Sequence, residues 1–324
     1  MPRYEEEYSN TKMLWIVLSI LGGLFLTMLL VCGGVIYWIA QNAGNFRNTP
    51  MFNTAQAIPE LELQTEDYAE ARNQFKTTLL KKGASPQASR PVKMPADAKE
   101  ITFPSGKLEL KAWINEPSEA KDKKAAVIFL HNGMAFGEED WEMAKPFRDA
   151  GFVTMTPLLR GENGQAGTYT LFYDEVDDVL AAADYLLKQP FVDEKRLFVA
   201  GHTEGGTLAL LTAMTSKRFR AAASFSGCPN LGIYLQGRQP LAPFAANNLR
   251  ELQMRSPVAY ATSFKCPVRL YFAPGEFMLD VASIQTATLA KQQGLDVEAV
   301  QVPGNNMTAV RPAMKQAIEF FQRP

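Results

Sequence analysis

The sequence predicts an α/β fold, with a mostly parallel sheet and helices on both of its faces. From Glu100 onward, short apolar, β-prone runs alternate with helix-forming segments, which is the pattern of strand–helix–strand units. The run Ala125–Leu130 is apolar throughout, as in strands that are covered on both faces. In the middle of this alternation, residues 197–200 predict a strand that turns sharply into a helix through Gly201-His202-Thr203-Glu204-Gly205.

The remaining elements follow from the same alternation. The first two strands are expected to pair antiparallel around Pro104-Ser105-Gly106, and residues 229–256 are expected to form an irregular insertion. The expected strands are 101–103, 108–114, 125–130, 152–157, 197–200, 221–225, 268–272 and 297–302. The expected helices are 139–150, 173–188, 205–216, 281–293 and 310–322.

A polar tail, residues 1–12, precedes a segment that we interpret as a transmembrane helix, residues 13–40. This segment has no charged residue, and at about 1.5 Å per residue it is long enough for a hydrocarbon core of roughly 30 Å. Tyr37 and Trp38 near its end suit a membrane interface. A cleaved signal peptide is the weaker alternative, because the apolar region is too long. Arg3 and Lys12 before the segment favour a single-pass protein with a cytoplasmic N-terminus and an exported domain.

Residues 41–96 are interpreted as a linker with one helix, from about 66 to 82, and residues 97–324 as the globular domain. The helix is expected because Tyr68, Ala71, Phe75 and Leu79 recur at helical spacing before Lys81-Lys82-Gly83. A proline-rich stretch, residues 84–96, then leads into the domain.

Composition excludes some functions, and it includes only two histidines that could serve as a catalytic base. The chain has 324 residues and a formal net charge of −1, so it carries no electrostatic footprint for nucleic acid. Its cysteines, Cys32, Cys228 and Cys266, are too few for a disulfide framework; Cys228 and Cys266 could pair only if the fold brought them together, and buried free thiols are the favoured alternative. No residue spacing predicts a metal site, and no cofactor is expected. The two histidines are His131 and His202.

The turn at Gly201–Gly205 has the frame of a nucleophile elbow, Gly-x-Ser-x-Gly, with Thr203 in place of serine. Such an elbow holds its central residue on a strained turn, and the neighbouring glycines let strand and helix cross closely. Threonine keeps the hydroxyl, but a β-branched residue is poorly suited to the positive φ that an elbow demands.

Several further motifs appear in the expected order around this elbow. They are Phe129-Leu130-His131-Asn132-Gly133, Leu159-Arg160-Gly161-Glu162-Asn163-Gly164, Asp174-Glu175-Val176-Asp177-Asp178-Val179, Arg255-Ser256-Pro257 and Lys265-Cys266-Pro267-Val268. With them, the segment from about 97 to 324 resembles the α/β-hydrolase fold, and more narrowly the catalytic domains of the prolyl oligopeptidase and dienelactone hydrolase group.

The resemblance implies a catalytic triad, which this chain matches poorly. Thr203 stands at the nucleophile position, and Glu276 or Asp280 is the candidate acid, since Met278 stands where an aspartate is common. Asn306, or next to it Met307, occupies the position of the histidine, and no histidine follows His202. The resemblance also implies an oxyanion hole made by Asn132 and the backbone N–H of Glu204.

Other candidates near the cleft have a structural and a functional interpretation. His131 is expected to border the cleft, in a structural or substrate-contact role rather than as a substitute base. Ser226 ends a strand on the cleft side, and packing in a turn explains it equally well. His202 is expected to pack beside the elbow, and the Glu204 side chain to cap the helix or face solvent.

Two classes of function remain open, and the missing histidine favours the first. One is a membrane-anchored pseudo-hydrolase that binds a peptide, a small ester-like ligand or a protein partner. The other is an active peptidase or esterase that uses Thr203 with an unusual base. A third and weaker alternative is a purely structural domain.

Overall fold

The computed structural model describes residues 60–117, 122–276, 278–305 and 307–323. They belong to one compact unit, Ile58–Pro324. The predicted tail, the predicted membrane segment 13–40 and Asn306 lie outside the described residues. Within the described ranges, no helix is both long enough and apolar enough to cross a membrane.

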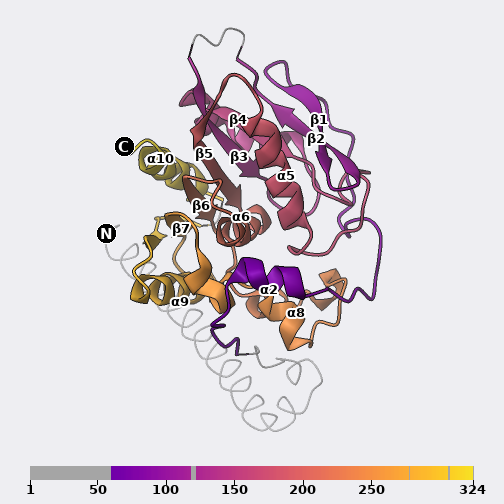
Figure 1. The fold of residues 1–324 in the computed structure, drawn as a ribbon, viewed down its shortest axis with the longest axis vertical. Helices are drawn as coiled ribbons and strands as arrows, with labels where there is room; N and C mark the ends of the chain where they lie inside the picture. Colours follow the sequence, from indigo (N-terminus) through magenta and orange to yellow (C-terminus); the bar gives the residue numbers. More distant parts are fainter. Residues whose placement is uncertain (1–59, 118–121, 277, 306, 324) are drawn as a thin grey trace, which may run out of the picture. The chain divides into compact units, whose positions relative to one another are not determined.

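A single eight-stranded sheet forms the centre of this unit, in the order β1-β2-β4-β3-β5-β6-β7-β8 (Figure 1). β1 pairs antiparallel with β2, and β2 antiparallel with β4, whereas the pairs from β4 to β8 are all parallel. This arrangement confirms the predicted mostly parallel sheet and its opening antiparallel pair. The strands are β1 (Lys99–Ser105), β2 (Leu108–Ile114), β3 (Lys124–Leu130), β4 (Val153–Pro157), β5 (Val192–His202), β6 (Ala221–Phe225), β7 (Val268–Phe272) and β8 (Val297–Gln301).

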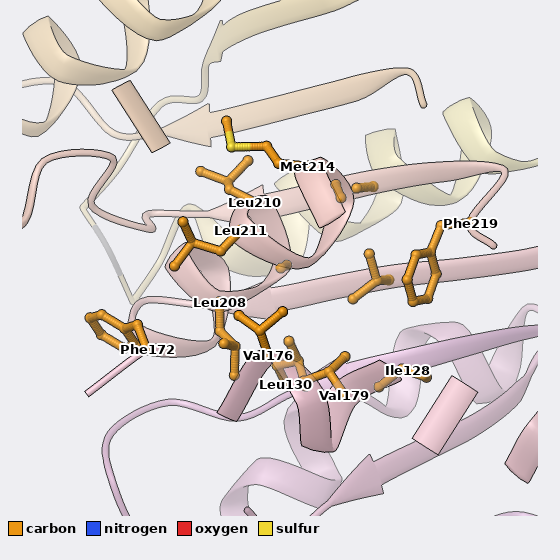
Figure 2. Close-up of a cluster of buried hydrophobic side chains, with 14 of the residues drawn as sticks. Ile128, Leu130, Phe172, Val176, Val179, Leu208, Leu210, Leu211, Met214 and Phe219 are labelled. Atoms are coloured by element: carbon orange, nitrogen blue, oxygen red, sulfur yellow. The ribbon is translucent and has the colours of Figure 1, made fainter. Parts of the chain in front are cut away.

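Helices cover both faces of the sheet because the buried strands are apolar on both faces. In β3, Val127 and Phe129 pack with the helices α4 and α10, and Ile128 and Leu130 pack with α5 and α6. Figure 2 shows Leu208 of α6 beside Val176 of α5 and Leu130. The helices are α2 (Tyr68–Gln74), α3 (Glu138–Met143), α4 (Lys145–Asp149), α5 (Glu175–Leu187), α6 (Glu204–Thr215), α7 (Leu231–Tyr234), α8 (Leu249–Gln253), α9 (Leu279–Gln292) and α10 (Val310–Phe321), with 3₁₀ turns at Gln239–Leu241 and Pro257–Ser263.

The segment before residue 97 is part of the domain rather than a linker outside it. Tyr68 is fully buried, and its hydroxyl donates to the carbonyl oxygen of Met254 at 2.8 Å. Arg72 donates to the carbonyl oxygen of Tyr173 at 2.7 Å and forms an ion pair with Asp177. In Figure 1 this segment begins the coloured chain, with α2 lying beside α6. The domain boundary predicted at residue 97 is therefore wrong, because the compact unit begins near residue 58.

The predicted helix over residues 66–82 is also too long. It begins at the N-cap Asp67 and ends at Gln74, after which Phe75 is extended. The next residues bond to the domain instead of continuing the helix. Thr78 donates its N–H to Glu251 Oε1 at 2.7 Å, and Leu79 forms a β-bridge with Phe244. These tertiary partners override the helical spacing of the apolar side chains.

Replacing Tyr68 with alanine is expected to lower the free energy of unfolding by about 3–5 kcal/mol, because a fully buried aromatic ring and its hydrogen bond are lost. Urea unfolding of the full chain measures the change. Gln74→Ala, an exposed position at the end of the same helix, is the control and should change stability by less than about 0.5 kcal/mol. Equal effects of the two substitutions would show that this segment does not stabilise the domain.

Candidate active-site cleft

The elbow has the strained geometry that its sequence predicts. Thr203 has φ 47° and ψ −108°, a conformation that residues with a Cβ rarely adopt. The residues two positions before and after it, Gly201 and Gly205, are glycines because the chain segments cross here with no room for a side chain. A Cβ on Gly201 would lie 2.2 Å from the Gly205 carbonyl oxygen, and one on Gly205 would lie 2.2 Å from the Leu130 carbonyl oxygen. The crossing places Thr203 at the first turn of α6.

The Thr203 hydroxyl contacts a carboxylate rather than a histidine. Its Oγ1 donates to Glu204 Oε2 at 2.6 Å, and the amide oxygen of Asn132 also lies in hydrogen-bond contact with it. The Glu204 side chain thus turns back over the elbow. It does not face solvent, because four donors near the elbow hold it, one of which is the first N–H of α6.

Glu204 occupies the place where an elbow normally binds an anion. Its Oε2 also accepts the N–H of Gly133 at 2.9 Å, and its Oε1 accepts the Tyr234 hydroxyl at 3.0 Å. Its own backbone N–H is the fourth donor. Burial alone would raise the pKa of Glu204, but these hydrogen bonds outweigh burial and lower it, so the group stays ionised near neutral pH.

The amide donors differ from those predicted for the oxyanion hole. The backbone N–H of Asn132 donates to Asp140 Oδ1 at 3.3 Å, so it is directed away from Thr203. The next N–H, that of Gly133, faces the elbow and is taken by the Glu204 carboxylate. The Asn132 side chain contacts Thr203 and the Glu204 N–H begins α6, but the loop amide that faces the elbow belongs to Gly133.

His131 is held away from Thr203 by a buried ion pair. Its Nε2 lies 2.9 Å from Glu162 Oε2, and its Nδ1 lies 3.1 Å from the carbonyl oxygen of Asn132. Burial alone would lower the pKa of His131, but the charge and hydrogen bond of Glu162 raise it to about 10. A histidine that is protonated at neutral pH cannot accept the proton of a nucleophile. His131 is therefore not placed to act as a substitute base for Thr203.

The two candidate acids have different surroundings. Glu276 lines the cleft, and its Oε1 lies 3.5 Å from Ser226 Oγ. Asp280 accepts the N–H of Val281 at 2.8 Å in the first turn of α9 and does not line the cleft. Burial raises the pKa of Glu276. Of the two, only Glu276 is placed to meet a ligand.

The cleft above Thr203 is open, with a volume of about 720 Å³. The bulky side chains of Met278 and Met307 do not fill it, because both are exposed, at 39% and 55%, and neither lines it. The described lining residues are Asn132, Thr203, Glu204, Thr207, Ser226, Cys228, Ile233, Tyr234, Gln236, Arg238, Glu276, Leu279 and Asn305.

The thiols and possible metal ligands add no reactive group to the cleft. Cys228 and Cys266 are free, as expected, and burial raises the pKa of the Cys228 thiol to about 11. The described residues contain no group of three or more histidine, cysteine or acidic side chains that could hold a metal ion.

Two functional side chains escaped the sequence analysis. The Glu204 carboxylate was not expected to contact Thr203 and the Gly133 loop, and Tyr234 was not singled out at all. An acidic residue directly after the elbow was the one available signal, since its carboxylate can reach back to the amides that surround the turn. Tyr234 gave none, because it comes from the irregular insertion, 30 positions further along the chain.

The comparisons with known proteins agree with this fold. A sequence model of the prolyl oligopeptidase family matches residues 140–277. The uncharacterized peptidase YtmA of Bacillus subtilis (strain 168) is 24% identical over 184 residues, which cover 52% of this chain and 70% of that protein. The uncharacterized peptidase YuxL of the same organism is 22% identical over 212 residues, which cover 59% of this chain and only 32% of that protein.

Among solved structures, the uncomplexed acylaminoacyl peptidase of Pyrococcus horikoshii is similar, with a TM-score of 0.57 and 22% identity over 70% of this chain and 41% of that chain. A putative dienelactone hydrolase from Klebsiella pneumoniae subsp. pneumoniae MGH 78578 gives a TM-score of 0.55 and 16% identity, over 70% of this chain and 98% of that chain. The described domain therefore has the α/β-hydrolase fold. Within that fold, the chain resembles the prolyl oligopeptidase family and the dienelactone hydrolases.

The His131–Glu162 pair predicts a stability that falls with rising pH. Because the folded state raises the pKa of His131 from 6.5 to about 10, the pair stabilises the fold fully below about pH 6.5, and this contribution is lost as the pH rises toward 10. Between pH 7 and pH 9, the free energy of unfolding should fall by up to about 1.4 kcal/mol per pH unit. Urea unfolding at these pH values measures the slope.

His131→Gln is the matched variant for this measurement, because its amide can still donate to Glu162 but does not titrate. Its unfolding free energy should lose most of the slope between pH 7 and pH 9. An identical slope in the variant and the wild type would assign the pH dependence to other groups.

Proposed function

We propose that this domain is a pseudo-hydrolase, which binds a peptide, a small ester-like ligand or a protein partner in its cleft without efficient turnover. The observation that carries the proposal is the Glu204 carboxylate, which takes the Gly133 N–H and the Thr203 hydroxyl for itself.

The bound carboxylate competes with the chemistry that the elbow would need. Acyl transfer at such an elbow develops a negative oxygen, which backbone N–H donors must stabilise. Here an internal anion already holds those donors, and removing a single donor of this kind costs about 10²–10³-fold in rate. A substrate carbonyl would have to displace a hydrogen-bonded, partly buried carboxylate first.

A proton acceptor of suitable basicity is also missing from the described cleft. His131 is directed to Glu162, and the position expected for the catalytic histidine carries Asn306 in the sequence. Glu204 does touch the Thr203 hydroxyl, but its lowered pKa makes it a weak base.

The open cleft favours binding over a purely structural role. A domain that serves only as a packing unit has no need for a cavity of about 720 Å³ above its most strained residue. Most of its described lining residues are polar, so a ligand would meet many hydrogen-bonding groups there, beside the aliphatic side chains of Ile233 and Leu279.

A weak hydrolase is the second candidate, favoured by the 2.6 Å contact between Thr203 Oγ1 and Glu204 Oε2. In this alternative, Glu204 would remove the proton of the Thr203 hydroxyl. The same carboxylate would also have to leave the Gly133 N–H free to stabilise the developing oxyanion. It cannot stay beside the hydroxyl as a base and release this N–H at the same time.

We further propose, from the sequence alone, that residues 13–40 anchor the protein in a membrane as a single span, with the N-terminus in the cytoplasm and the domain exported. The ligand would then be met outside the cytoplasm.

The full chain is expected to hydrolyse activated acyl esters and short peptide amides no faster than its Thr203→Ala variant. The reason is that the donors at the elbow are occupied and no neutral imidazole is present in the described cleft. Release of chromophore from the ester, and of amine from the amides, measures turnover. Hydrolysis that disappears with Thr203→Ala would contradict the proposal and support the second candidate.

Removing the Glu204 carboxylate should free its hydrogen-bond donors to bind the carboxylate of a ligand. In the Glu204→Ala variant, the Gly133 N–H and the Tyr234 hydroxyl lose their acceptor, so butyrate is expected to bind and to raise the melting temperature. The wild type should show no such rise. Glu276→Ala, which removes the other cleft carboxylate, is the control and should not respond to butyrate. A response shared by all three proteins would show that Glu204 does not occupy an anion site.

A further inference from the structure

We propose that Glu276 is a binding subsite for an ammonium group of the ligand in the cleft. The proposal rests on the binding role proposed above and specifies the chemistry of the ligand.

One carboxylate oxygen of Glu276, Oε2, accepts no hydrogen bond from the described residues. The carboxylate has a weak 3.5 Å contact between Oε1 and Ser226 Oγ and a backbone hydrogen bond from Ala273, but its Oε2 is buried with no hydrogen-bond partner among the described residues. A carboxylate oxygen that is removed from water without a donor costs free energy. A ligand that brings such a donor recovers this cost on binding.

The position of Glu276 lets a ligand reach this acceptor. The residue follows Gly275, which has φ 75°, in the loop after β7, and it is only half-buried. It lines the same cleft as Thr203 and Asn305. The last torsion of a glutamate side chain is soft, so a small rotation turns Oε2 from its buried position into the cleft.

The charges around the cleft select a cation. Glu204 is held ionised and Glu276 is a second carboxylate, so an anionic ligand would meet like charges at the floor of the cleft. One cation, Arg238, also lines the cleft; it is exposed, and its guanidinium lies over the ring of Tyr234 at 5.2 Å from the centroid. An ammonium group offers three donors and a positive charge, which makes stronger hydrogen bonds to a carboxylate than a neutral amide does.

Two aliphatic side chains of the cleft favour an apolar substituent beside the ammonium group. Ile233 and Leu279 line the cleft, and each is only 9% exposed. Leu279 lies in the first turn of α9, three positions after Glu276. The ligand is therefore an amine that carries an aliphatic side chain, as at the free amino end of a peptide or at the end of a lysine side chain.

Calorimetric titration of the full chain with three probes tests this assignment. The probes are Leu-Ala-Ala amide with a free amino end, its N-acetylated form, and N-acetyl-lysine amide. We expect a probe with an ammonium group to bind and acetylation of the amino end to weaken binding at least tenfold. Preference for the first or the third probe assigns the ammonium group to a chain terminus or to a lysine. Equal binding of the acetylated form, or no binding of any probe, overturns the proposal.

Glu276→Gln keeps the size of the side chain and removes its charge. This variant is expected to bind the preferred amine at least tenfold more weakly. Asp280→Asn is the matched control, because Asp280 is a carboxylate near Glu276 that does not line the cleft, and it should change the affinity less than twofold. Equal affinities of Glu276→Gln and the wild type overturn the proposal.

Peptide cleavage is followed by mass spectrometry in the same samples, which keeps the two proposals separate. Cleavage that is lost with Thr203→Ala contradicts the pseudo-hydrolase proposal alone. The amine preference is then measured in the Thr203→Ala background, where it still decides the role of Glu276.

Discussion

The close crossing of β5 and α6 is the constraint on which the rest of the site depends. Gly201 and Gly205 allow it, since a Cβ at either would lie 2.2 Å from a backbone oxygen, and Gly206 lets the same helix start pack closely on Ser224 and Gly227. The crossing forces Thr203 to a positive φ and aims the start of α6 at the cleft. It also brings the Gly133 loop, 71 positions earlier in the chain, within hydrogen-bond distance of Glu204.

A helix start of this kind favours a negative charge, because its first N–H groups are unpaired and the helix dipole is positive there. In this chain the negative charge comes from the first residue of α6 itself. Glu204 satisfies its own N–H, the Gly133 N–H and the Tyr234 hydroxyl together, which keeps these donors paired without any ligand. The arrangement that stabilises the free protein thus opposes the binding of a developing oxyanion.

Local sequence patterns predicted the sheet and the elbow. They did not predict side-chain orientations that depend on residues distant in the sequence. Apolar runs such as Ala125–Leu130 predicted central strands correctly, because a strand that is buried on both faces consists almost entirely of apolar residues. The predicted helix beyond Gln74 failed, since Glu251 and Phe244 supply partners that no local pattern contains. The turn of Glu204 onto Thr203 escaped prediction for the same reason, as Gly133 and Tyr234 are distant in sequence.

The missing histidine and the bound Glu204 carboxylate are physically coupled. An imidazole beside Thr203 would need the hydroxyl proton that Glu204 Oε2 now accepts at 2.6 Å. The other carboxylate of the cleft, Glu276, has a buried oxygen, Oε2, for which the described residues provide no donor. The two carboxylates of the cleft are therefore left in opposite situations: Glu204 is saturated with donors, and Glu276 lacks one. A ligand gains little by competing at the first and more by donating to the second, so binding in this cleft is expected to depend on the ligand's hydrogen-bond donors.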